Sequence, residues 1–146
     1  LSAMPPDFPD RMEGGTLPVL PIAALGGGLR YLAANCDRIT RTEQFCYRTL
    51  RSILLAHPRV RLYLPESAEG SLILFNLEKL DCADAAERFD RFGIGLRDGL
   101  HCAPLAHRKI GTAETGALRI SFGPFLTQND LDHFDWALHR IAGAGA

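Results

Sequence analysis

Apolar residues recur at helical spacing in the first part of the chain. The first run begins near Pro21, and its apolar positions are Ile22, Leu25, Leu29 and Leu32. Three glycines at 26–28 interrupt this helix, since each costs about 1 kcal/mol relative to alanine, and they suggest that another backbone lies close by. A second run starts at a capping box over 40–43 and ends near His57, because Pro58 disfavours a helical residue before it. The pattern predicts two consecutive helices.

Short apolar segments after residue 58 predict a small sheet. We expect strands at 60–63, 71–77, 94–96 and 118–122. The last of these alternates in polarity, so Leu118, Ile120 and Phe122 are expected to face a core. Arg119 and Ser121 are then expected to face away from it.

Two further helices are predicted to cover this sheet. One begins at the N-cap Asp81 and stops at Gly93, and the other begins after the N-cap Thr127. Residues 97–117 are expected to be irregular. The chain is therefore predicted to be an α/β (α+β layer) protein with a two-helix segment followed by a small mixed sheet packed by helices. Its organisation would be an extended segment over 1–20 and one α/β domain over 21–146.

Composition limits the class of protein. A chain of 146 residues with 47% hydrophobic and 23% charged residues has the size and content of one soluble globular domain. The formal net charge of -1 gives no field that would attract nucleic acid or an anionic membrane. Apolar stretches stop well short of the roughly 20 residues of a membrane helix, and the first residues lack the pattern of a secretory signal. Four cysteines without a C-x-x-C pair favour reduced thiols in a cytoplasmic protein.

The densest group of reactive side chains lies between residues 97 and 107. Arg97, His101, Cys102 and His107 fall in a predicted loop, where functional residues are often displayed. Cationic neighbours would favour the thiolate of Cys102, but most free cysteines are small buried apolar residues, so the residues alone leave both interpretations open. With no second cysteine or carboxylate nearby, we expect no metal site. Packing is the expected role of the cysteines on or beside predicted helices, which are Cys36, Cys46 and Cys82.

Three segments carry motifs that occur together in one family. They are Arg97-x-Gly99-x-His101-Cys102-x-Pro104-Leu105, the run from Pro9 to Gly15-Thr16, and Arg119-x-Ser121 followed by Thr127. The first resembles the cysteine loop of group II cysteine desulfurases and selenocysteine lyases, which are class V aminotransferase-superfamily enzymes of fold type I that use pyridoxal phosphate (PLP). The second is similar to the family's Arg-Phe-Glu-x-Gly-Thr segment. Order and spacing agree, so the resemblance covers almost the whole chain and corresponds to the last third of such an enzyme.

The resemblance implies a role for several residues. Cys102 would be the nucleophile that takes sulfur from L-cysteine or a related amino acid as a persulfide, and His101 would help to position or ionise it. Arg119 would bind the substrate carboxylate. Gly15 and Thr16 would lie at the cofactor, with Thr16 reaching the phosphate bound by the partner subunit of a homodimer. Arg97 would serve equally well in a structural ion pair or in catalysis.

The resemblance also implies pyridoxal 5'-phosphate as the cofactor of the parent enzyme. The chain has two lysines, Lys79 and Lys109, and neither has the His-Lys context of the family's Schiff-base lysine, which precedes the matched segment. The isolated chain is therefore expected to be inactive, while the parent would convert L-cysteine to L-alanine and pass sulfur to an acceptor protein. Departures from the family pattern at Leu17-Pro18, Asp98 and Phe125-Leu126 put the exact substrate in question.

Two alternatives remain at this point. One is another class V enzyme, a transaminase or β-lyase in which Cys102 is incidental. The other is a stand-alone, non-catalytic remnant or sulfur-carrier module that works without PLP. The segment at Gly15-Thr16 argues against the second alternative, because it has no evident task away from a cofactor.

Overall fold

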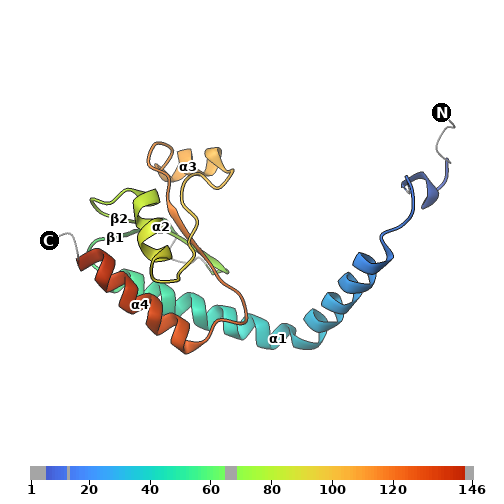
Figure 1. Ribbon diagram of the computed structural model, residues 1–146, viewed down its shortest axis with the longest axis horizontal. Helices are drawn as coiled ribbons and strands as arrows, with labels where there is room; N and C mark the ends of the chain where they lie inside the picture. The colour runs from blue at the N-terminus through green and yellow to red at the C-terminus, as the bar shows by residue number, and fades with distance from the viewer. Residues whose placement is uncertain (1–5, 13, 65–68, 144–146) are drawn as a thin grey trace. The chain divides into compact units, whose positions relative to one another are not determined.

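The computed structural model describes residues 6–12, 14–64 and 69–143. The chain forms two compact units, Leu1–Cys36 and Asp37–Ala146. The first unit contains the 3-10 helix η1 (Asp10–Met12) and the beginning of helix α1 (Val19–Ala56), which continues into the second unit. The sheet, the other helices and the buried core all belong to the second unit (Figure 1).

Helix α1 corrects the prediction of two leading helices. It runs unbroken through the three glycines, because glycine weakens a helix without forbidding its backbone angles. It also continues through the predicted capping box over 40–43, where the Thr42 hydroxyl donates to the Arg38 carbonyl, as it can inside a helix. A Cβ added at Gly27 or Gly28 would meet nothing within 4 Å, so no other backbone among the described residues lies beside these two glycines. The buried residues of α1 all come from its second part and are Cys46, Tyr47, Leu50 and Leu54.

The sheet has three strands in the order β1 (Val60–Leu62), β2 (Leu72–Leu77) and β3 (Leu118–Ser121). Both pairings are antiparallel, with Val60 opposite Leu77 and Leu74 opposite Arg119. The prediction of a mixed sheet is therefore wrong, because the strands of the described residues pair only in the antiparallel sense. Each connection brings the chain back in the direction opposite to the preceding strand.

The two faces of the sheet have different neighbours. Ile73 and Phe75 of β2 and Leu118 and Ile120 of β3 are buried on one face, as the alternation predicted for β3. Arg119 points to the opposite face and is partly exposed. Strand β3 thus contributes to the core with one set of residues and presents Arg119 on the other face.

Three aromatic rings form the centre of the core. They come from Phe75 of β2, Phe89 of α2 (Cys82–Asp90) and Phe134 of α4 (Gln128–Gly143). Phe89 and Phe134 stack with their centroids 5.5 Å apart, and Phe75 meets them edge-on at 6.3 and 6.5 Å. Each such pair is worth about 0.5–1.5 kcal/mol beyond the area it buries, so this cluster fixes both helices against the sheet.

Both predicted limits of α2 and the predicted start of α4 are confirmed. The Asp81 carboxylate accepts a hydrogen bond from the Ala83 N–H at 2.8 Å, and the chain leaves α2 through Gly93 at φ 75°. At the start of α4, the Asp130 carboxylate accepts hydrogen bonds from the N–H and hydroxyl of Thr127, at 2.8 and 2.6 Å. These caps satisfy backbone donors that the helices leave free.

The segment from 94 to 117 differs from the prediction in two ways. Residues 94–96 form no strand; the next residue, Arg97, makes an isolated bridge to Arg119 instead. The expected irregular loop contains the short helix α3 (Pro104–Ile110), which has Pro104 at its first turn and ends at the left-handed Gly111. Seven residues are too few to show helical periodicity in the sequence.

In the described part of the chain, no helix has the length and apolar content needed to cross a membrane.

Candidate active site

Cys102 is exposed at the tip of a tight turn, which lies between the bridge of Arg97 to Arg119 and helix α3. The turn spans Leu100 to Ala103, whose N–H donates to the Leu100 carbonyl at 2.8 Å. Its two central residues, His101 and Cys102, both have positive φ, 51° and 58°, which is the pattern of a type I′ turn. A left-handed residue other than glycine costs roughly 1–2 kcal/mol, so the surrounding structure must impose this conformation.

Strand β3 and the residues before it hold this loop in place. The Arg97 N–H donates to the Arg119 carbonyl at 3.2 Å, the Arg119 N–H donates back to the Arg97 carbonyl at 2.7 Å, and Ala117 donates to Gly99 at 3.1 Å. Gly116, at φ 63°, packs so closely that a Cβ on it would lie 2.8 Å from the Cα of Gly99. The backbone therefore fixes the start of the Cys102 turn to the strand that carries Arg119.

A row of side-chain contacts runs from His101 in the turn through His107 to Thr112. The His101 Nε2 lies 3.3 Å from the Arg97 carbonyl oxygen, and the His101 Nδ1 lies 3.3 Å from the His107 Nε2. The His107 Nδ1 lies 2.7 Å from the Thr112 hydroxyl. His107 and Thr112 are each only 1% exposed, whereas His101 is half-buried. The turn is thus tied to α3 through side chains as well as through the backbone.

The surroundings of His101 disfavour its charged form. Burial is the main cause of a lowered pKa, the charges of Arg119, His107 and Arg97 add to it, and the hydrogen bond to the Arg97 carbonyl opposes it. These surroundings therefore lower the pKa of His101 and favour its neutral imidazole over the charged form.

Arg119 has a buried atom without a partner. Its Nε has no hydrogen-bond partner among the described residues, although the rest of the side chain is only half-buried. A buried donor that the described residues leave unpaired is uncommon, and its usual partners are a water molecule or a bound ion or ligand. The charge of this guanidinium acts on His101, which places Arg119 close to the Cys102 turn.

The expected site residues therefore fall into two groups. Arg97, His101, Cys102 and Arg119 come together in the second unit. Gly15 and Thr16 lie in the first unit, where both are exposed. Sequence reasoning missed Thr112 and the pairing of His107 with His101. The usable signal was a His at the fourth residue of a helix that begins at Pro104, just after the Cys102 turn.

The other cysteines differ from one another. Cys46 and Cys82 are buried, as expected for packing residues, and burial raises the pKa of both thiols. The Cys82 thiol donates to the Thr115 carbonyl at 3.1 Å. Cys36 is exposed, so its expected packing role is wrong for the described chain. Among the described residues, no cluster of three or more His, Cys, Asp or Glu side chains could hold a metal ion.

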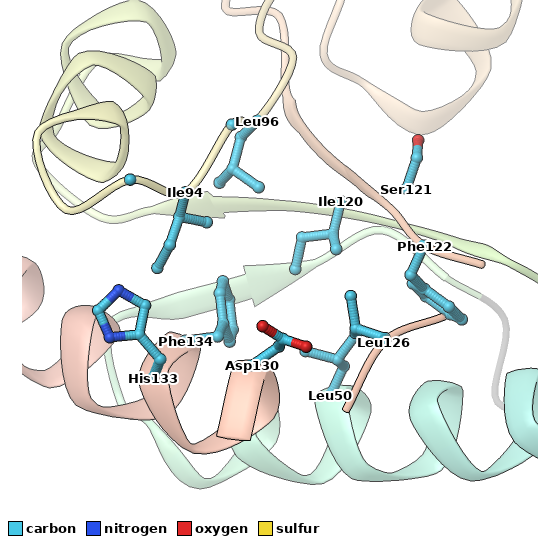
Figure 2. A pocket seen from close by; sticks show the side chains of 12 residues that line it. Leu50, Ile94, Leu96, Ile120, Ser121, Phe122, Leu126, Asp130, His133 and Phe134 are labelled. Atoms are coloured by element: carbon cyan, nitrogen blue, oxygen red, sulfur yellow. The ribbon is translucent and has the colours of Figure 1, made fainter. Parts of the chain in front are cut away.

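A cavity of about 230 Å³ lies on the core face of the sheet, away from Cys102. Figure 2 shows its mainly apolar lining, which includes Ile94, Ile120, Phe122 and Phe134. Asp130 and His133 contribute its polar groups. None of the expected site residues lines this cavity, so the chemistry of the Cys102 turn is separate from it.

Comparison with known proteins identifies the family. Residues 3–134 match the model of the family "Aminotransferase class-V". A cysteine desulfurase of Dickeya dadantii (strain 3937) is 33% identical over 136 residues, which are 92% of this chain and 32% of that protein. A cysteine desulfurase of Escherichia coli O127:H6 is 34% identical over 136 residues, 91% of this chain and 32% of that protein.

Solved structures agree with this result. The apo structure of a cysteine desulfurase from Thermococcus onnurineus NA1 superposes with a TM-score of 0.85 at 26% identity, covering 93% of this chain and 34% of that one. The cysteine desulfurase CsdA from Escherichia coli, in an S-sulfonic acid form, superposes with a TM-score of 0.81 at 26% identity, covering 93% and 33%.

These similarities confirm the α/β fold and the PLP-enzyme class expected from the sequence. The chain belongs to the class V aminotransferase family. It spans about a third of the length of the curated relatives that it matches.

Proposed function

We propose that this chain is the carboxy-terminal part of a PLP-dependent cysteine desulfurase that takes sulfur from L-cysteine onto Cys102. One observation carries the proposal: Cys102 is exposed in a turn of costly backbone conformation, and Arg97, at the start of the same loop, exchanges two main-chain hydrogen bonds with Arg119, which has an unpaired buried nitrogen. The similarity to cysteine desulfurases over more than nine-tenths of the chain supports the same reaction.

Arg119 binds the carboxylate of the amino acid in this proposal. A guanidinium donates through several N–H groups in a fixed fork, which suits a carboxylate better than a single ammonium group does. The anion would supply the acceptor that Arg119 Nε lacks in the described residues. Because Arg119 and Arg97 bridge through their backbones, the bound substrate would lie beside the Cys102 turn.

Cys102 is the sulfur acceptor. Its thiolate attacks the sulfur of the substrate, so that an S–S bond forms while the bond between sulfur and the substrate Cβ breaks. The electron pair of the broken bond stays on carbon, which takes up a proton. L-cysteine and the thiol thus give L-alanine and the persulfide, and the balance needs no external oxidant or reductant.

The residues of the chain fit the surroundings of PLP in part. When bound, PLP acts as an electron sink that makes the bond from the substrate Cβ to sulfur labile. Gly15 and Thr16 are the residues proposed to lie at its phosphate, where an exposed hydroxyl and a glycine without neighbours within 4 Å leave room for an anion. Their site is proposed to form across a homodimer.

Neither lysine fits the attachment of the cofactor. A lysine that forms a covalent bond with a carbonyl is activated by removal from water or by a cationic neighbour, yet Lys79 and Lys109 are both exposed. We therefore assign the Schiff-base lysine to another part of the longer protein. An isolated preparation of this chain is expected to be inactive.

The test uses the full-length protein that contains this chain, loaded with PLP, and compares Cys102→Ser with Cys36→Ser. Both cysteines are exposed, so the pair is matched for access. We expect Cys102→Ser to lose the persulfide and to slow alanine formation by at least about a hundredfold, and Cys36→Ser to do neither. Undiminished desulfuration by Cys102→Ser contradicts the role of Cys102, and amino-group exchange with a keto acid in place of sulfide release identifies a transaminase.

A further inference from the structure

The hydrogen bonds beneath the Cys102 turn have one possible direction when both histidines are neutral. The Arg97 carbonyl can only accept, so the Nε2 of His101 carries the proton. The Nδ1 of His101 is then an acceptor, which requires the Nε2 of His107 to donate. The Nδ1 of His107 is in turn an acceptor, and the Thr112 hydroxyl donates to it. A single carbonyl thus determines the tautomer of both rings.

In this arrangement neither ring nitrogen of His101 has a free lone pair to accept a proton. Its Nε2 holds a proton, and the lone pair of its Nδ1 is already used by His107. A proton added at Nδ1 would face the N–H of His107, and relief would require His107 to move its own proton to Nδ1 and Thr112 to accept instead of donate. The Thr112 hydroxyl proton would then need a new acceptor, and because His107 and Thr112 are each 1% exposed, water is not available to accept it.

The charges around His101 act in the same direction. Arg119 of β3 and Arg97 of the loop itself would repel a protonated His101, and His107 of α3 would add to this repulsion only if it were also charged. Among the described residues, no carboxylate is one of the groups that act on His101. Geometry and charge therefore both hold the ring neutral.

We propose that His107 is a positioning residue that, oriented by Thr112, holds His101 as the neutral Nε2–H tautomer. His101 then stabilises the turn in which Cys102 is exposed, and it is not the base that removes the proton from the Cys102 thiol. This role replaces the expectation that His101 helps to ionise Cys102, and it rests on the proposed function only in taking Cys102 as the reacting thiol. The exposed position of Cys102 lets its proton leave to solvent or substrate.

The test begins with the state of the rings and needs neither cofactor turnover nor substrate. Ring nitrogens of ¹⁵N-histidine-labelled full-length protein are observed by NMR between pH 5 and 8, with His101→Gln and His107→Gln proteins to assign the signals. We expect both rings to show the Nε2–H tautomer, and His101 to stay neutral at pH values where a free histidine side chain, with a pKa of about 6.5, is already protonated. A His101 that is charged at pH 7, or that carries its proton on Nδ1, overturns the proposal.

Two variants separate positioning from simple packing. His107→Phe keeps a buried ring but removes the donor to His101, so the His101 titration should move to higher pH. The rate of Cys102 alkylation, followed by peptide mass spectrometry, should then gain a second step at lower pH, because a cationic neighbour favours the thiolate. His107→Gln offers an amide N–H to His101 and an oxygen to Thr112, so it should restore the behaviour of the native protein.

The outcomes are distinct from those of the desulfurase test. Equal His101 titrations in the native protein and in His107→Phe overturn the positioning role, as does a His107→Gln protein that behaves like His107→Phe. If His107→Phe does not fold, the tautomers of the native protein and the His107→Gln titration still decide the question. A Cys102→Ser enzyme that retains full activity would refute the desulfurase proposal while leaving these ring measurements unchanged.

Discussion

Arg97 and Arg119 exchange main-chain hydrogen bonds of 3.2 and 2.7 Å, and this bridge joins the loop that carries Cys102 to the strand that carries the carboxylate-binding candidate. Two segments 22 residues apart in the sequence are thereby placed at a fixed separation. The arginine side chains are not equivalent. Arg97 is exposed, whereas Arg119 is half-buried with an unpaired Nε. We therefore expect their substitutions to have different effects.

Arg119→Lys should weaken substrate binding in the full-length, PLP-loaded protein. Lysine keeps the positive charge but cannot form bidentate hydrogen bonds with a carboxylate. Because a charge-assisted hydrogen bond is worth about 1.5–3 kcal/mol, KM for L-cysteine should rise by roughly 10- to 100-fold. Steady-state kinetics provide the measurement, with Arg97→Lys as the matched control that leaves KM nearly unchanged. An unaltered KM in Arg119→Lys would exclude Arg119 from carboxylate binding.

Gly116→Ala should destabilise the Cys102 loop. The new Cβ would lie 2.8 Å from the Cα of Gly99 and 3.1 Å from the Cys82 sulfur, at a φ of 63° that favours glycine. Strain of this kind costs about 1–3 kcal/mol, which chemical denaturation would detect. The control is Gly95→Ala, where the added Cβ meets nothing within 4 Å and φ is not positive. Equal stability of the two variants would mean that the contact between Gly116 and Gly99 does not constrain the loop.

Phe89→Ala should remove much of the stability of the second unit. The ring is fully buried between Phe75 and Phe134, and truncation of a buried phenylalanine costs about 3–5 kcal/mol through lost burial and the cavity that remains. Phe45 is 52% exposed on α1, so Phe45→Ala should cost well under half as much. The free energy of unfolding in urea compares the two, and similar losses would be inconsistent with this core.

Stability should fall as the pH decreases below about 6.5, the ordinary pKa of histidine. Burial lowers the pKa of both His57 and His101 in the folded protein, with nearby positive charges adding to the effect. The unfolded chain therefore binds more protons than the folded one below that pH, which favours unfolding until the folded-state pKa values are reached. His57→Gln should make the decrease of Tm between pH 7 and 5 shallower. A Tm that rises on acidification would contradict the direction of both shifts.

The strength of each local pattern decided how much could be predicted from the sequence. Strand β3 and the ends of α2 and α4 were predicted correctly, because alternation and capping side chains act over a few residues. Helix α1 was divided wrongly before the capping box predicted over 40–43, since a capping pattern alone cannot show whether a helix begins there or continues through it. The bridge at Arg97 depends on pairing with a distant strand, which no local pattern records.

The residues of the candidate site could likewise be predicted only in part. Cys102 and Arg119 were recognisable from short motifs, and the structure joins the loop that carries Cys102 to the strand that carries Arg119 through the backbone of Arg97. The link between His101 and His107 could not be predicted, because it requires α3, a helix too short to produce a periodic pattern. Gly15 and Thr16 remain predictions, and they await a measurement on the longer protein.

The alternation along β3 has a consequence for how this protein can change over evolutionary time. Leu118 and Ile120 are buried in the core, and Arg119 between them points to the opposite face of the sheet. Selection for a well-packed interior and selection for substrate preference therefore act on interleaved positions of one short strand, with little interference between them. A new substrate could be accommodated from the Arg119 face while the scaffold is inherited intact.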